Sequence, residues 1–160
     1  MANIIQLYSN NDSFTKLVID MRKVMQTLNQ AEKATSILAA RKEAESYLSD
    51  NHKVFVYQFN EELVAYSVIK IEDQVCWLDW LYLKPEYRGT SVASDLFDHA
   101  ETFAKELGND QLYIWVHPDN QPMLKFLKKK GYDVLNLIEV KKEKPKSTYK
   151  IDIFDNKFRY

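Results

Sequence analysis

The chain has 160 residues, of which 46% are hydrophobic and 28% are charged, and its formal net charge is -1 at pH 7. This length suits one compact domain, and so small a charge gives no electrostatic reason to expect a nucleic-acid partner. No apolar stretch approaches the roughly 20 residues of a membrane helix, and the polar N-terminus predicts no signal peptide, so we expect a cytoplasmic protein that binds no membrane.

The first half of the chain predicts a strand, a pair of helices and three more strands. Residues 3–8 form a short apolar run, and apolar residues then recur at helical spacing over residues 14–28 and 34–48. From residue 53 the period becomes that of strands. Three strand patterns follow one another with short polar turns between them, which predicts an antiparallel meander: KVFVYQF, LVAYSVIKI and QVCWLDWLYL.

The second half predicts alternating helices and strands. A helical stripe over residues 92–107 ends at Gly108, a typical C-cap, and the strand QLYIWVH follows. A second helix opens at Asn120 and ends before Gly131, a strand begins at Tyr132, and TYKIDIF forms the last strand. This order fits an α/β (α+β) fold in which helices cover both faces of one sheet.

The loop PEYRGTSVAS between the meander and the next helix has the placement of a phosphate-binding loop, because helix N-termini expose unpaired N–H groups and a partial positive charge. It resembles the signature loop of the GNAT superfamily of N-acetyltransferases. There, Gln or Arg, two residues, Gly, one residue, then Gly or Ala cradle the pyrophosphate of acetyl-CoA. Arg88 and Ala93 match this pattern, whereas Ser91 replaces a glycine. Taken alone, the loop is equally consistent with a serine-capped helix start.

The resemblance extends over residues 53–140. NEELVAYSVIKI resembles the second and third strands of the family, WLDWLYLKPEYRG the fourth strand and its loop, and HPDNQPMLKFLKKKGYDV the Asn-led helix that ends in Gly-Tyr or Gly-Phe. It implies one GNAT domain over residues 1–160, with a mixed, mostly antiparallel sheet of about six to seven strands. It also implies an N-acetyltransferase that uses acetyl-CoA as its co-substrate.

The resemblance further implies which residues hold acetyl-CoA. In this family the fourth and fifth strands splay apart, and free backbone groups of the fourth bind the pantetheine arm as another strand would. Those groups belong to Leu81, Tyr82 and Leu83, and Asn120 matches a position that commonly touches the cofactor, although it is equally suited to cap its helix. The expected pyrophosphate loop consists of Arg88, Gly89, Thr90, Ser91, Val92, Ala93 and Ser94.

Asp79 is the best candidate for the base that an amine needs before it can attack a thioester. Strand alternation puts it on the face of Trp77, Leu81 and Leu83 and puts Trp80 on the opposite face, and a carboxylate among apolar neighbours needs a task or a partner. LDWLYLKPEYRG also resembles the diamine and polyamine acetyltransferase branch, where an acidic residue is common at this position. A structural salt bridge is the alternative.

Leu127 departs from the family, in which a tyrosine often protonates the leaving thiolate. Either water replaces this acid, or Tyr113, Tyr132 or His117 does, or catalysis has been lost. His117, just past the fifth strand, is therefore a second candidate catalytic residue, although such a histidine is more often a surface hydrogen-bonding group. A noncatalytic acyl-CoA-binding or sensing module is the alternative function.

The remaining titratable residues suggest the acceptor but no metal. His52 and His99 lack ligand spacing, so we expect no metal site. Cys76 is expected in the core, on the face opposite Asp79. Three acidic residues expected near the acceptor would favour a cationic amine, such as a polyamine, a diamine, a protein lysine or an N-terminus: Glu61, Glu62 and Asp79. The resemblance makes a homodimer a further expectation.

Overall fold

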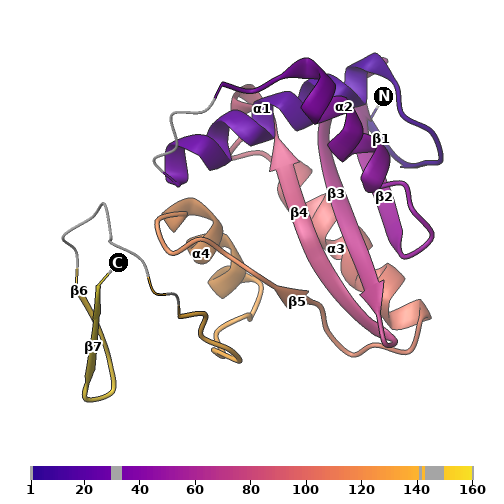
Figure 1. The fold of residues 1–160 in the computed structure, drawn as a ribbon. Coiled ribbons are helices and arrows are strands. Elements are labelled where there is room, and N and C mark those ends of the chain that lie inside the picture. The colour runs from indigo at the N-terminus through magenta and orange to yellow at the C-terminus, as the bar shows by residue number, and fades with distance from the viewer. Residues whose placement is uncertain (1, 30–33, 141, 143–149, 160) are drawn as a thin grey trace. The chain divides into compact units, whose positions relative to one another are not determined.

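The computed structural model describes residues 2–29, 34–140, 142 and 150–159 (Figure 1). The chain divides into two compact units, Met1–His117 and Pro118–Tyr160. The elements of the first unit are β1 (Ala2–Leu7), α1 (Asp12–Leu28), α2 (Ile37–Ser46), β2 (His52–Phe59), β3 (Glu62–Glu72), β4 (Val75–Leu83), a 3-10 turn (Pro85–Tyr87), α3 (Val92–Glu106) and β5 (Tyr113–Ile114). Those of the second unit are α4 (Gln121–Lys129), β6 (Lys150–Ile153) and β7 (Asn156–Arg159).

The first unit is built on a five-stranded sheet with the order β1-β2-β3-β4-β5. Neighbouring strands are antiparallel from β1 to β4, and only β5 runs parallel to its neighbour. The turns of the meander have positive φ at both central residues, Asn60 with Glu61 and Asp73 with Gln74, as type I′ hairpins require. The predicted meander is therefore confirmed.

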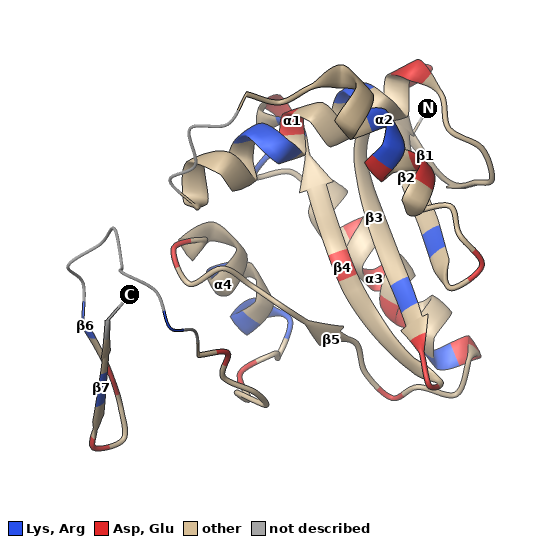
Figure 2. Cartoon of the chain, in the orientation of Figure 1, with Lys and Arg blue, Asp and Glu red and all other residues tan. Residues whose placement is uncertain are grey.

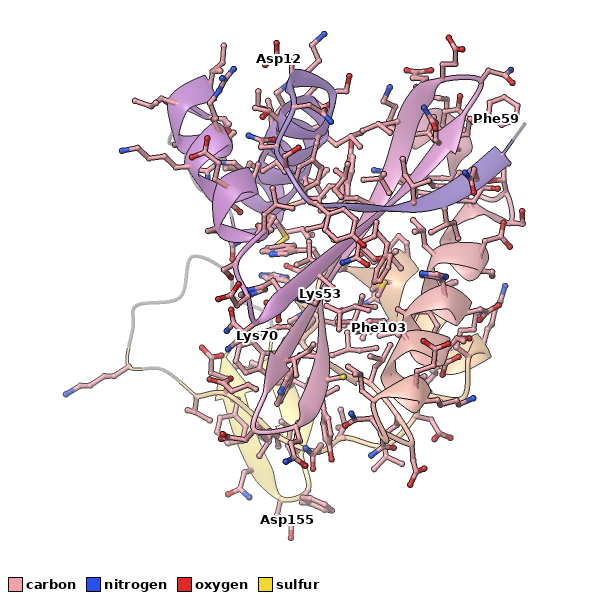
Figure 3. The ribbon with its side chains drawn as sticks, turned by 90° about the vertical axis from the view of Figure 1, so that its right-hand side faces the viewer. Asp12, Lys53, Phe59, Lys70, Phe103 and Asp155 are labelled. Atoms are coloured by element: carbon pink, nitrogen blue, oxygen red, sulfur yellow. The ribbon has the colours of Figure 1, made fainter. Side chains whose placement is uncertain are left out.

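Helices cover both faces of this sheet, as predicted. α1 and α2 lie on one face, and α3 lies on the other, where Phe103 meets Phe55 of β2 with ring centroids 5.4 Å apart (Figures 1 and 3). Asn11 and Ser36 cap the N-termini of α1 and α2 through their side chains. Among the described residues, no helix is both long and apolar enough to cross a bilayer.

The core between the sheet and the helical pair is large and contiguous. Phe14 of α1 packs edge-on against Tyr66 of β3, with centroids 5.2 Å apart, and both side chains are fully buried. Its other members are Leu17, Val18, Met21, Ala40, Ala44, Tyr47, Val54, Val56, Leu63, Val68 and Tyr82. In α2 the buried face differs from the predicted stripe, because Ile37 and Leu38 are exposed.

The C-terminal part differs from the sequence prediction. Of the expected strand QLYIWVH only Tyr113–Ile114 pairs, and residues 132–140 form no strand because they pair with no described segment. The last predicted strand begins at Lys150 and forms a hairpin with Asn156–Arg159, which was not predicted. The first two residues of TYKIDIF lie outside the described residues. The sheet therefore has five strands instead of six to seven, and the other two strands pair with each other.

Candidate active site

The outer edge of β4 is only partly covered. β5 pairs with it at two positions, Trp77 with Tyr113 and Leu78 with Ile114. Within the described part of the first unit, no strand pairs with the rest of β4, Asp79–Leu83, on that side. A free row of backbone N–H and C=O groups can bind an extended chain as an added strand.

The register shows which backbone groups of β4 face this edge. The N–H of Lys84 donates to the carbonyl of Val64 over 2.9 Å, and hydrogen-bonded and non-hydrogen-bonded pairs alternate along antiparallel strands. The backbone groups of Tyr82 therefore point to β3, whereas those of Leu81 and Leu83 point to the open edge. Of the three residues predicted for the pantetheine arm, two present free backbone groups.

A β-bulge interrupts β4 at Asp79. Val68 of β3 lies opposite Trp80, and the next residue, Ile69, lies opposite Leu78, so Asp79 is an extra residue on β4. Bulges often re-aim a side chain beside a functional site. Asp79 is thus set apart from the regular ladder at the point where the open edge begins.

The bulge changes which face the tryptophans occupy. Trp77 lies opposite Lys70 and Trp80 opposite Val68, and residues two apart on a strand share a face. Both tryptophans therefore face α1 and α2, and the prediction that they lie on opposite faces was wrong because alternation does not hold across a bulge. Two residues predicted on the face of Asp79 lie on the face of α3 instead: Leu81 and Leu83.

Asp79 lies on the α1/α2 side of the sheet, beside a histidine. Its Oδ2 is 3.5 Å from Nε2 of His52, and the two side chains are 27% and 16% exposed. Burial raises the pKa of the Asp79 carboxyl, the charges of His52 and Lys70 oppose the rise, and Glu72 adds to it. In Figure 2 the acidic position within β4 lies close to the basic position within β3. The carboxylate therefore has a histidine nitrogen within reach and also a raised basicity.

A pocket of about 210 Å³ adjoins this part of β4. It is lined from α1, α2 and β4 by residues including Met21, Arg22, Met25, Gln26, Glu43 and Trp80. The carboxylate of Glu43 accepts hydrogen bonds from Arg22 and from the hydroxyl of Tyr47. Burial raises the pKa of Tyr47, with Tyr66, Glu43 and Asp79 adding to the rise. Sequence reasoning missed Glu43, because its position in α2 carries no sign of contact with β4.

The acidic residues Glu61 and Glu62 do not join this group. They line a different pocket, of about 400 Å³, and Glu62 forms an ion pair with Lys84. Asp79 lies opposite the junction of Val68 and Ile69, six residues further along β3, which corresponds to about 20 Å at the usual rise of a strand. Glu61 and Glu62 therefore do not lie beside Asp79, and Glu43 is the acidic residue that lines the pocket of Trp80.

The loop that follows β4 leads into the N-terminus of α3, where several backbone N–H groups have no acceptor among the described residues. Gly89 has φ 78°, and Thr90 donates from its hydroxyl to the carbonyl of Tyr87 over 2.6 Å. Ser91 begins α3 without a side-chain capping bond, because its hydroxyl donates to Asp95 over 3.0 Å. Apart from a 3.4 Å contact between the N–H of Val92 and Thr90, no described group accepts from the backbone N–H groups of residues 89–94. The loop is not a serine-capped helix start.

Asn120 and Cys76 make hydrogen bonds within the fold, and His117 lies just after β5. Asn120 caps α4, with its Oδ1 accepting from the N–H of Met123 over 3.3 Å. His117 follows β5 by three residues and is not among the groups that shift the pKa of Asp79. Cys76 is buried and accepts from the amide of Asn109 over 3.4 Å. Within the described ranges, no group of three or more His, Cys, Asp or Glu side chains is arranged to hold a metal ion.

Comparison with known proteins identifies the family. The model of the acetyltransferase (GNAT) family matches residues 20–132. An aminoglycoside acetyltransferase from an uncultured soil metagenomic sample, solved with sisomicin, is similar in fold, with a TM-score of 0.67, 14% identity and coverage of 91% of this chain and 97% of that one. Aminoglycoside N-acetyltransferase AAC(6')-Iy, solved with CoA, has a TM-score of 0.67, 15% identity and coverage of 91% and 96%.

A further solved structure, a putative acetyl transferase from Pyrococcus furiosus, has a TM-score of 0.68 and 21% identity, and the match covers 89% of this chain and 100% of that one. No curated protein matches the chain. The family match covers more than half of the chain and runs from within α1 to Tyr132, three residues after α4, and the fold agrees with it. The chain therefore belongs to the acetyltransferase (GNAT) family and is an N-acetyltransferase.

Proposed function

We propose that the protein transfers an acetyl group from acetyl-CoA to a cationic primary amine by direct attack, with Asp79 as the base. The observation that carries this proposal is the open edge of β4, Asp79–Leu83, which begins at a partly buried carboxylate and leads into a loop with free amides. A thioester and an amine could meet along such an edge, with the carboxylate beside the reacting nitrogen. Residues 1–160 would act as one domain, since the family match spans both compact units.

The same edge and loop would hold acetyl-CoA. The free backbone groups of Leu81 and Leu83 suit the amides of a pantetheine arm, and the next positive element is the start of α3. There the amides of residues 89–94 and the guanidinium of Arg88 would bind the pyrophosphate. The family resemblance adds Asn120 as a further proposed contact. The residues proposed for the cofactor are thus Leu81, Leu83, Arg88, Gly89, Thr90, Ser91, Val92, Ala93, Ser94 and Asn120, whereas the backbone groups of Tyr82 pair with β3.

The chemistry requires a neutral amine. An alkylammonium has a pKa of about 10.4, so a base must remove one proton near neutral pH, and the raised pKa of Asp79 makes its carboxylate a stronger base. The nitrogen then attacks the acetyl carbonyl, a C–N bond forms and the C–S bond breaks. The family's tyrosine acid is absent here, since Leu127 occupies its position. A thiol of pKa about 8.5 leaves readily as its anion, so the thiolate departs without an acid and then takes up a proton from water.

The carboxylates near Trp80 indicate which class of amine the protein would accept. Asp79 precedes Trp80 in β4 and Glu43 lines the pocket beside it, and these two carboxylates favour a polyamine, a diamine, a protein lysine or an N-terminus over a neutral or anionic amine. We further propose a cytoplasmic location, a homodimer and no nucleic-acid partner. His117 stays a proposed second catalytic residue with weaker support than Asp79.

A thermal shift and a thiol-release assay on one sample test this function. Acetyl-CoA and CoA should raise the melting temperature, since a ligand that binds the folded state stabilises it. Free thiol should then appear with at least one member of a panel of polyamines, diamines and lysine peptides. Stabilisation without release from any amine would favour a sensing module, and no stabilisation would contradict acetyl-CoA binding at this loop.

A further inference from the structure

His52 connects the buried side of Asp79 to the protein surface. Its Nε2 is 3.5 Å from Asp79 Oδ2, while its Nδ1 is 2.8 Å from Ser49 Oγ and 2.9 Å from Asn51 Oδ1. Ser49 and Asn51 are exposed in the turn before β2, whereas the His52 side chain is only 16% exposed. A line of polar atoms therefore runs from the bulge of β4 across the sheet to solvent.

The contacts of Nδ1 determine where the imidazole carries its hydrogen. Ser49 donates its single hydroxyl hydrogen to Asn51 Oδ1 over 2.9 Å, so both oxygens near Nδ1 present lone pairs to it. Nδ1 of His52 therefore carries the hydrogen, and Nε2 of the neutral ring faces Asp79 with a lone pair. A lone pair and a carboxylate that face each other lack a hydrogen between them, so Nε2 is free to accept a proton that reaches the Asp79 carboxylate.

The other charged groups around this pair come from each element that packs against it. Lys70 of β3 lies opposite His52 and forms an ion pair with Glu72 of the same strand over 2.7 Å. The hydroxyl of Tyr47, at the end of α2, is held by Glu43 and stays protonated. In the turn, Lys53 bonds the backbone carbonyl of Asp50. None of these groups stands between Nε2 and the carboxylate.

We propose that His52 is a positioning residue that takes the acceptor's proton from Asp79 and passes it to solvent at the turn of residues 49–51. The inference rests on the proposed function of Asp79. An ammonium gives one proton to the carboxylate, the proton moves to Nε2, and the imidazolium releases Nδ1–H towards Ser49 and Asn51. The amine's second proton is lost as the C–N bond forms, and the thiolate takes up one proton, so one net proton leaves for each acetyl group transferred.

The pH dependence of kcat/KM tests this relay. Because the relay needs an ionised carboxylate and a neutral imidazole, the wild-type kcat/KM should fall along an acid limb as the pH is lowered. His52→Gln should lower kcat/KM by about 10- to 100-fold and remove this limb. The matched control is His99→Gln, since His99 packs on Phe55 over the other face and should change neither quantity.

Chemical rescue and NMR separate the relay from a structural role. Imidazole in the assay should restore part of the rate of His52→Ala in proportion to its concentration. Without any acceptor, the imidazole signals of His52 should show the Nδ1–H tautomer at high pH. Should His52→Gln fail to fold, Asn51→Ala should lower the rate about 10-fold, because it removes one of the two oxygens that hold the hydrogen of His52 on Nδ1.

Three results would overturn the inference: an unchanged acid limb in His52→Gln, no rescue by imidazole, or an Nε2–H tautomer in the apo protein. If the wild-type enzyme is active and any of these results is found, the relay is wrong but the proposed acetyl transfer with Asp79 as the base still stands. A wild-type protein that releases no thiol with any amine would instead contradict the proposed function, and the relay would fall with it.

Discussion

The hydroxyl of Ser91 donates to Oδ2 of Asp95 over 3.0 Å, along the helix that it begins and away from the amides at the helix start. Tyr57 of β2 donates to the same oxygen over 3.2 Å, so both the sheet and the loop hold this carboxylate. The serine that departs from the family's glycine is thus folded back on its own helix. Its side chain neither caps nor fills the space in front of the free amides.

Ser91→Gly is therefore expected to leave CoA binding nearly unchanged. Ser91 has φ -70° and ψ -16°, which any residue adopts, so glycine relieves no strain. Replacing a serine by glycine at a helix start costs only a few tenths of a kcal/mol, which corresponds to less than about a threefold change in Kd. Calorimetric titration with CoA would measure it, and a gain of tenfold or more would show that the serine obstructs the phosphates.

Gly89→Ala is the matched control in the same loop. Gly89 has φ 78°, and nothing lies within 4 Å of an added Cβ, so only backbone strain opposes the substitution. Strain of about 1–2 kcal/mol in this region should displace the loop and weaken CoA binding roughly 10-fold.

Asp79→Asn should lower kcat/KM about 100-fold near neutral pH, where a primary amine is largely protonated and needs a base. The loss should shrink as the pH approaches about 10, because the amine then reaches the site already neutral. Thiol release measured from about pH 6 to 10 gives the profile. A loss of the same size at every pH, or no loss, would argue that Asp79 is structural.

The same substitution should stabilise the protein. The folded-state pKa of Asp79 is raised, so its contribution to stability is present below the usual value of about 3.9 and is lost as the pH rises through the folded-state value. At neutral pH the ionised carboxylate opposes folding, and Asp79→Asn should raise Tm by about 2 °C, with no difference near pH 3. Asp133→Asn, at an exposed position, is the control. A lower Tm at neutral pH would mean that the pair with His52 stabilises more than burial costs.

Tyr66→Phe should be neutral or stabilising by up to about 1 kcal/mol, because the hydroxyl of Tyr66 is buried and no described group bonds it. Tyr47→Phe is the contrast, since it removes a hydrogen bond to Glu43 and should destabilise by about 1 kcal/mol. Urea unfolding of the three proteins would compare them. A clear destabilisation by Tyr66→Phe would point to a buried water that bonds this hydroxyl.

The sequence predicted most of the first unit, because local signals there agree with the tertiary structure. Apolar periodicity located both helices of the pair, two short turns located the meander, and Gly108 ended α3 as expected. The family and its activity followed from the loop around Arg88 and the order of its neighbours, and both were confirmed.

The parts that were missed depend on contacts that a single sequence does not display. The bulge at Asp79 appears only in the register with Val68 and Ile69, so the faces of Trp80 and the residues after it were assigned wrongly. His52 has no metal-ligand spacing in the sequence, and its contact with Asp79, two strands away, is visible only in the sheet. The apolar run after Tyr132 looked like a strand, but a strand needs a partner that composition does not supply.

Because of the bulge in β4, the residues that pair with β3 and the residue proposed for the chemistry, Asp79, are different ones. If Asp79 were deleted, Leu78 and Trp80 would become neighbours with ordinary alternation, each still opposite its present partner on β3. The carboxylate is therefore an addition to a strand that is complete without it. In evolutionary terms, gain or loss of a single codon at this position could switch the chemistry while the scaffold stayed the same.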